Sequence, residues 1–139
     1  MPLAESATRV QQQTDDAANR AIQLATKQRL EYFRNHPQEI PARMRELDQE
    51  WDIERALETG SSCVSLAGLV LGIGGSRKWL LVPLVVQGFF LQHALQGWCP
   101  PLPLFRKMGF RTVEEIDKER EALKELQRGR HFRRRNGHN

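Results

Sequence analysis

The chain has 139 residues, the length of a single domain, and its 21 Lys and Arg against 17 Asp and Glu give a net charge of +4. Aromatic residues make up 7% of it and are scarce outside the middle, so neither polar end can bury a sizeable core of its own. The sequence contains no nucleophilic serine elbow, no phosphate-binding glycine loop ahead of a lysine and no catalytic Cys–His motif. We therefore predict a protein that is not an enzyme and that uses no cofactor, no metal and no small-molecule substrate.

The first third of the chain predicts two helices. Residues 4–34 have a composition that favours a helix, but their apolar positions form only a weak stripe, which indicates a helix on a surface or facing a partner. Pro37 ends this helix, and Pro41 suits the first turn of a second, amphipathic helix that runs towards Trp51. Two interpretations of Trp51 stay open: an anchor at the level of lipid headgroups, or a contact with another helix of the same chain.

The middle of the chain is almost free of charge. Between Glu58 and Arg106 the only charged side chains are Arg77 and Lys78, and an apolar run lies on either side of this pair. The runs occupy residues 57–75 and 79–97. Each run is roughly 28 Å long as a helix, close to the thickness of the hydrocarbon layer of a bilayer. We predict an all-α membrane protein: a two-span transmembrane helical hairpin with amphipathic cytoplasmic helices before and after it.

Charges beside the hairpin predict its orientation. Lys and Arg near its outer ends outnumber the two in the turn, which favours cytoplasmic N- and C-termini and a short turn on the other side. The first residues lack the basic and apolar parts of a signal peptide, so we expect the hairpin to insert uncleaved. The predicted regions are a cytoplasmic or interfacial helical region at 1–56, the hairpin at 57–104, and a cytoplasmic helix with a basic tail at 105–139.

Polar residues within the two spans predict an intramembrane cluster, because polar groups in lipid need partners. A hairpin folded at Arg77 brings Gln96 level with Glu58, and His93 level with Ser61. The predicted cluster comprises Glu58, Ser61, Ser62, Gln92, His93 and Gln96. His93 has two interpretations, a ligand or proton-exchanging group and a hydrogen-bonded polar residue, and the second is favoured because no other His or Cys lies at ligand spacing.

Small residues gather on one side of the first span. Ser65, Gly68 and Gly72 recur at helical spacing, and small residues let helix backbones approach closely in lipid. The stripe is either a homodimer seam or the contact with the second span of the same hairpin. We favour the second interpretation.

The two cysteines are too far apart to pair. With the hairpin folded at Arg77, Cys63 and Cys99 differ in depth by roughly 12 Å at the helical rise, whereas a disulfide needs Cα atoms closer than about 7 Å. Cys99 lies at the predicted boundary between membrane and cytoplasm, where a thiolate can accept sulfur, bind metal or be acylated. The alternative is that a small residue simply fits a tight helix exit, and this alternative is favoured.

The stretch Gly97-Trp-Cys-Pro100 resembles a small two-helix inner-membrane family of unknown function that also forms the membrane part of some bacterial rhodanese proteins. In that family a Gly-x-Cys-Pro closes the second span, an acidic-basic pair like Glu54-Arg55 precedes the first, and a Gly-Leu-rich run like Gly68–Gly72 fills it. The match covers roughly residues 52–111, and this chain has no rhodanese domain to donate sulfur. The resemblance implies a hairpin in the bacterial inner membrane.

The chain turns polar after the second span. Prolines at 100, 101 and 103 cannot continue the helix, and Thr112-Val-Glu-Glu115 is a capping box that predicts a new one, ending near Gly129. The arginines after Gly129 predict a disordered tail that contacts anionic lipid. They are Arg130, Arg133, Arg134 and Arg135. No nucleic-acid recognition module accompanies them.

Taken together, the sequence predicts a non-enzymatic inner-membrane accessory or scaffold protein that anchors cytoplasmic helices. Its expected partners are membrane lipids and either further copies of itself, as a homo-oligomer, or a larger membrane protein complex. Two alternatives stay open: a thiol-dependent sulfur or redox carrier that uses Cys99 at the membrane surface, and a soluble helical oligomer that buries the apolar middle.

Overall fold

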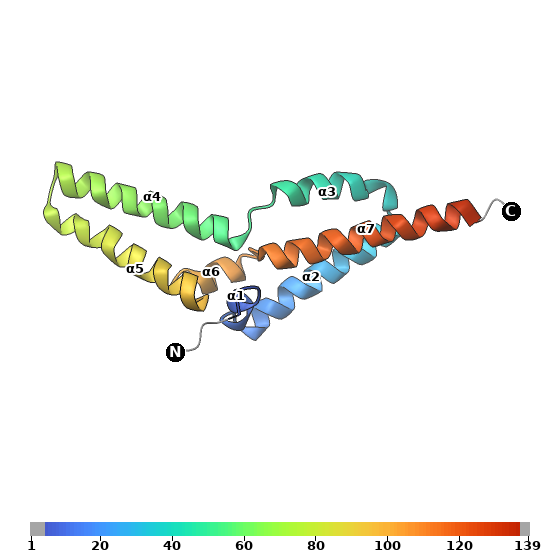
Figure 1. Cartoon of the computed structure of the whole chain (residues 1–139), viewed down its shortest axis with the longest axis horizontal. Helices are drawn as coiled ribbons and strands as arrows, with labels where there is room; N and C mark the ends of the chain where they lie inside the picture. The colour runs from blue at the N-terminus through green and yellow to red at the C-terminus, as the bar shows by residue number, and fades with distance from the viewer. Residues whose placement is uncertain (1–4, 137–139) are drawn as a thin grey trace.

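The computed structural model describes residues 5–136, and these residues form helices joined by short connections, with no strand among them. The molecule is elongated: a helical hairpin forms one end, and the C-terminus lies at the other (Figure 1). The helices are α1 (Arg9–Gln12), α2 (Asp16–Asn35), η1 (Pro37–Glu39), α3 (Ile40–Gln49), α4 (Ile53–Gly74), η2 (Arg77–Leu80), α5 (Leu81–Gln96), α6 (Leu102–Lys107) and α7 (Val113–Asn136).

The hairpin consists of α4, the 3-10 helix η2 and α5. Asp52 caps the start of α4, where its carboxylate accepts a hydrogen bond from the amide of Arg55 at 2.9 Å. The 22 residues of α4 extend roughly 33 Å at the helical rise. By length and composition, two helices of the structure are apolar enough to cross a membrane, which agrees with the two predicted spans.

The two helices of the hairpin approach closely where the first one carries glycine. A Cβ built on Gly68 would lie 2.7 Å from Cδ of Pro83, and one built on Gly72 would overlap the side chain of Leu80. The hydroxyl of Ser65, one turn before Gly68, accepts a hydrogen bond of 3.0 Å from the side-chain amide (Nε2) of Gln87. Ser65, Gly68 and Gly72 thus lie in the contact between the two helices of one chain.

Helices α2, α3 and α7 pack together and form the bundle, whose core comprises Phe33, Ile40, Leu47, Ile116 and Leu123. These helices come from both sides of the hairpin in sequence. The predicted regions 1–56 and 105–139 are therefore not separate structural units. Neither end has enough apolar surface to form a core alone, and each supplies part of a shared one.

The capping box at the start of α7 is confirmed. The hydroxyl of Thr112 accepts a hydrogen bond from the amide of Glu115 at 3.2 Å, and the carboxylate of Glu115 accepts one from the amide of Thr112 at 2.9 Å. The predicted end near Gly129 and the predicted disordered tail are wrong, because α7 continues to Asn136. One glycine costs a helix only about 1 kcal/mol relative to alanine, and the arginines that follow are good helix formers.

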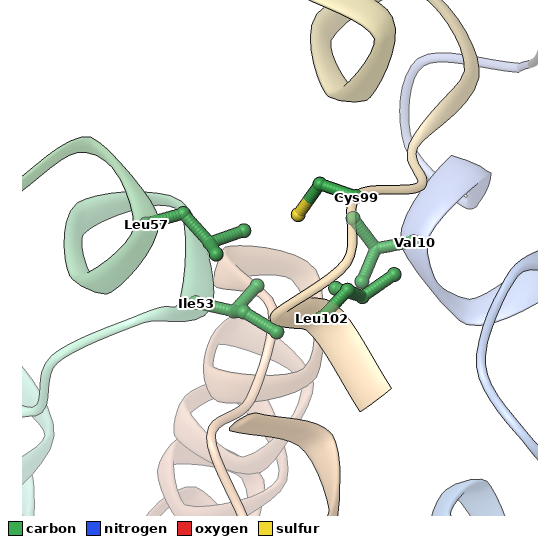
Figure 2. Close-up of a cluster of buried hydrophobic side chains, with 5 residues drawn as sticks. All are labelled: Val10, Ile53, Leu57, Cys99 and Leu102. Carbon is green, nitrogen blue, oxygen red and sulfur yellow. The ribbon is translucent and has the colours of Figure 1, made fainter. Parts of the chain in front are cut away.

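A second apolar cluster joins the hairpin to the bundle (Figure 2). We call this region the junction; it is formed by α1, the start of α4, the loop after α5, and α6. Its buried side chains are Val10, Ile53, Leu57, Cys99 and Leu102. The prolines expected to end the second span do so, and they lead into the short helix α6.

Candidate functional site at the junction

A glycine fixes the position of the N-terminal segment against the hairpin. Gly97 ends α5 with a φ of +81°, a left-handed conformation that favours glycine, and its amide donates to the carbonyl of His93 at 2.7 Å. A Cβ at Gly97 would lie 2.6 Å from the carbonyl carbon and oxygen of Arg9. The backbone of α1 can therefore lie directly on the end of α5 only because this residue has no side chain.

Close contact at Gly97 brings together three polar side chains from three segments. The guanidinium of Arg9 donates to Oε1 of Glu54 at 2.8 Å, and Nε2 of His93 lies 2.9 Å from Oε2 of the same carboxylate. His93 is only 1% exposed. Glu54 thus binds Arg9 from α1 and His93 from α5, and it holds the imidazole in one orientation.

Cys99 completes this arrangement. The thiol lies close enough to the imidazole of His93 to interact with it, and Cys99 is 3% exposed. Its sulfur points from the loop towards Leu57 on α4 (Figure 2). The second ring nitrogen of His93, Nδ1, is buried and has no hydrogen-bond partner of good geometry. Thiol, imidazole and carboxylate follow one another in the order that nucleophile, base and orienting group take in nucleophilic catalysis.

A cavity of about 430 Å³ lies beside the thiol, between the two hairpin helices and the loop that follows them. Its walls are almost wholly apolar. The lining residues include Leu57, Val64, Phe89, Phe90, Cys99 and Phe105. A volume of this size lies within the range of small-molecule sites, roughly 300–1,000 Å³. Both cysteines are free thiols, as the prediction of no disulfide requires, and Cys63 is exposed on α4.

His93 of the predicted intramembrane cluster has a different partner from the expected Ser61. The hydroxyl of Ser61 donates to the carbonyl of Glu58 in its own helix at 3.1 Å, and Glu58 and Ser62 are exposed. Gln92 and Gln96 are half-buried. His93 binds Glu54, roughly two helical turns before the expected Ser61. Two features cause this difference. The chain reverses before Arg77, and the 3-10 helix η2 rises about 2.0 Å per residue, compared with about 1.5 Å in an α-helix. Each residue of α5 therefore lies level with an earlier residue of α4 than a hairpin folded at Arg77 would give.

Charged side chains buried in the bundle were not predicted. Glu119 is 0% exposed and accepts hydrogen bonds from Arg29 at 3.2 Å, Arg43 at 2.9 Å and Arg111 at 2.5 Å. Arg111 also forms a two-bond pair with Glu50, at 2.7 Å for each bond. This group lies beside the apolar core of the bundle and ties α2, α3 and α7 together.

A second buried pair lies between the bundle and the junction. The guanidinium of Arg106 in α6 donates to both oxygens of Glu115 in α7, at 2.7 and 2.8 Å. It also donates to the hydroxyl of Thr14 and the side-chain oxygen of Asn19. Since Arg106 is buried, these bonds satisfy a charge that has lost its water. They link the segment after the hairpin to the bundle.

The buried carboxylates make the bundle sensitive to acid. Burial tends to raise the pKa of Glu119, but hydrogen bonds from Arg43 and Arg29 and the charge of Arg111 outweigh it, and the pKa is lowered from 4.5. In the same way Arg106 and the amide of Thr112 lower the pKa of Glu115. A carboxyl whose pKa is lowered by folding stabilises the fold above its unfolded pKa, and this stabilisation is lost as pH falls through the folded value.

We therefore expect the thermal unfolding midpoint of the bundle to hold above about pH 5 and to fall as the pH is lowered from about pH 4.5. Circular dichroism of the protein in detergent measures this midpoint. In Glu119→Gln the total decline should be smaller, because one titrating group is gone. An equal decline in both proteins would show that Glu119 does not contribute to it.

The four arginines predicted to face lipid are exposed at the C-terminal end of α7. Figure 1 shows this end at the opposite extreme of the molecule from the hairpin turn. Arg130 follows the first residue of α7, Val113, by 17 positions (130 minus 113), or roughly 26 Å along the helix. At physiological ionic strength, salt screens the interaction between charges that are more than about 8 Å apart. Contact between these arginines and the membrane that the hairpin is predicted to enter stays a prediction, and this geometry disfavours it.

Comparisons of the chain with models of protein families, with curated proteins and with solved structures found no match. The resemblance of Gly97–Pro100 to a two-helix membrane family therefore stays an expectation. Among residues 5–136 no group of three or more His, Cys, Asp and Glu side chains is placed to hold a metal ion, so we assign no metal ligands.

Proposed function

We propose that this protein is a membrane-anchored scaffold: the hairpin crosses the bilayer twice and holds the bundle at the cytoplasmic face. The observation that carries the proposal is the contrast between the two halves of the molecule. The hairpin exposes large apolar side chains on its outer faces, and the bundle exposes charges. We consider the most apolar stretch of 18 residues in each candidate span. Only 28% of this stretch is buried in the first and 6% in the second, whereas the core helix of a soluble protein is mostly buried.

Tryptophans mark both ends of the hairpin. Trp79 is exposed beside the turn, and Trp51 is exposed in the connection to α4, where the guanidinium of Arg55 lies 6.0 Å from the centre of its ring. Trp98 is half-buried at the end of α5. Tryptophans are enriched at the two interfaces of a membrane. The spacing of these rings along the hairpin supports a bilayer-spanning placement with the turn at the far side.

Buried and partly buried ion pairs connect the helices of the scaffold. Arg9 and Glu54 bind α1 to α4, Arg106 and Glu115 bind α6 to α7, and the interactions around Glu119 bind α7 to α2 and α3. The hairpin and the bundle are thus connected through packed and charged contacts at the junction instead of a free linker. Such a connection holds the bundle at a fixed place relative to the membrane, where a larger complex or further copies of the chain can bind it.

Two matched leucine substitutions test the anchoring. Leu66 lies near the middle of the first predicted span and is 62% exposed, and Leu24 lies on the bundle and is 56% exposed. In water both Leu66→Arg and Leu24→Arg are surface changes of little effect. In lipid, arginine at the centre of a span costs about 2.5–3.5 kcal/mol on insertion scales, so Leu66→Arg alone should reduce alkali-resistant membrane association.

Fractionation of cells after extraction with alkaline carbonate provides the measurement. The proposal predicts that the original chain and Leu24→Arg stay in the membrane pellet while Leu66→Arg shifts into the supernatant or is degraded. Recovery of the original chain in the supernatant, or of a folded oligomer from detergent-free buffer, would support the soluble-oligomer alternative instead. A homogeneous monomer after purification in mild detergent would count against a subunit role.

A further inference from the structure

We propose that Cys99 is an acylation site: the cavity beside it binds one long acyl chain, which becomes attached to the sulfur as a thioester. This inference goes beyond anchoring. It rests on the proposed anchoring role only in placing the cavity at the edge of the hydrocarbon layer, where juxtamembrane cysteines are S-acylated in other proteins. Acylation also accounts for three features of the site at once: the thiol, the imidazole and the apolar walls of the cavity.

The reactive groups are arranged for activation of the thiol. A carboxylate can only accept, so the contact with Glu54 requires a hydrogen on Nε2 of His93, and in the neutral ring Nδ1 is then the basic nitrogen. Nδ1 has no other hydrogen-bond partner, although the ring is almost fully buried. A base inside a protein without such a partner is available to take a proton, and the thiol of Cys99 is the ionisable group that interacts with the ring besides Glu54.

The cavity indicates what the thiol reacts with. Three phenylalanines and the aliphatic side chains of α4 line it, and Cys99 supplies its sulfur. A polar substrate would leave its hydrogen bonds unmade against these walls, which is unfavourable. A methylene chain needs no such bonds and gains about 0.8 kcal/mol for each CH₂ that it buries. An acyl chain attached to coenzyme A by a thioester fits both requirements, because the chain enters the cavity and the polar carrier stays in water.

The reaction is an exchange of thioesters. Nδ1 of His93 takes the proton of the Cys99 thiol, and the sulfur attacks the carbonyl carbon of the acyl group. The new carbon–sulfur bond to Cys99 forms, the bond to the sulfur of coenzyme A breaks, and coenzyme A leaves as a thiol with the proton from His93. No electrons are transferred to or from an outside reagent, and one thioester replaces another.

The experiment uses the full chain in detergent micelles, incubated with palmitoyl-coenzyme A or acetyl-coenzyme A and followed by intact mass. We expect the mass to rise by one palmitoyl group, and hydroxylamine at neutral pH to remove it. Cys99→Ser should abolish the gain and Cys63→Ser should leave it unchanged. His93→Gln should slow it by roughly 100-fold, the contribution of a positioned base.

Two glycine substitutions separate binding in the cavity from simple thiol reactivity. Gly60 lines the cavity and Gly88 does not, and a Cβ at either position has no atom within 4 Å. Gly60→Leu should fill part of the cavity and slow palmitoylation at least tenfold, while Gly88→Leu should keep the original rate. Equal rates for the two variants, equal rates with acetyl- and palmitoyl-coenzyme A, or attachment to Cys63 would overturn the proposal.

The test does not depend on the anchoring role, because detergent replaces the bilayer. A chain that is acylated in micelles but extracted by alkali refutes the anchoring alone. A chain that resists alkali but gains no acyl group refutes the acylation alone. Unchanged circular dichroism of the Gly60→Leu protein serves as the check that the variant folds.

Discussion

Replacing Glu119 with alanine is expected to reduce the stability of the bundle by about 3 kcal/mol, at the lower end of the cost of breaking a buried ion pair. The substitution removes the shared partner of three arginines, of which Arg111 is buried and Arg43 is mostly so. Arg111 keeps its two bonds to Glu50, and this remaining pairing limits the loss. Because 1.4 kcal/mol corresponds to a factor of ten, amide protection should fall about 100-fold.

Hydrogen exchange read by mass spectrometry measures this effect region by region. Peptides from α2, α3 and α7 should lose protection, while peptides from α4 and α5 should keep it, since the described ion pairs of Glu119 go to Arg29, Arg43 and Arg111 and none goes to the hairpin. Glu121→Ala is the matched control: this residue lies on the same helix but is exposed and pairs only with Lys124 among the described ion pairs. The explanation fails if both variants exchange at the same rate.

Replacing Gly97 with alanine should undock the N-terminal segment from the hairpin. Two separate costs contribute: a non-glycine residue at φ +81° is strained by about 1 kcal/mol or more, and its Cβ would overlap the backbone of Arg9. Backbone atoms cannot relieve the overlap by changing rotamer as a side chain could. The overlap therefore reduces the stability of the docked state by a further amount of about 1–3 kcal/mol. Undocking exposes the peptide bond after Arg9, and trypsin should cleave there at least tenfold faster than in the original chain.

Gly109 provides the control for the strain. It also has a positive φ, +94°, but a Cβ there has no atom within 4 Å. Gly109→Ala therefore measures the backbone term without the overlap, and the difference between the two alanine variants gives the contribution of the contact with α1. If Gly109→Ala accelerates cleavage after Arg9 as much as Gly97→Ala does, contact at Arg9 is not the cause.

Local signals in the sequence predicted the helical class, the hairpin and the capping box. Each depends on residues close together in the chain: the spacing of Ser65, Gly68 and Gly72, and the pair of Thr112 with Glu115. The sequence analysis placed the end of α7 near Gly129, but one glycine costs a helix only about 1 kcal/mol and the helix continues. Whether a segment forms a helix or a strand depends on the pattern of neighbouring residues. The residue at which a helix ends depends on free-energy differences of only about 1 kcal/mol.

The candidate site depended on long-range contacts, which the sequence did not predict. His93 and Cys99 were identified singly, but the contact of His93 with Glu54 required the true register of the hairpin, set by the early reversal and η2. Glu119 and Arg106 looked like ordinary solvated charges, because a charged residue surrounded by charges in sequence is usually exposed. The scarcity of aromatic residues in the two polar ends was a usable signal, because a small apolar core leaves part of the contact between helices to charged side chains.

The contact between Arg9 and Gly97 also has a consequence for the biogenesis of the protein. The two residues are 88 positions apart (97 minus 9), so the beginning of the chain leaves the ribosome long before its binding surface exists. At synthesis rates of about 5–20 residues per second, this segment waits roughly 4–18 seconds before Gly97 is made. The end of α5 must be made and must fold back along α4 first. Docking of the waiting segment is therefore a late event in folding, and it requires that both helices of the hairpin have formed.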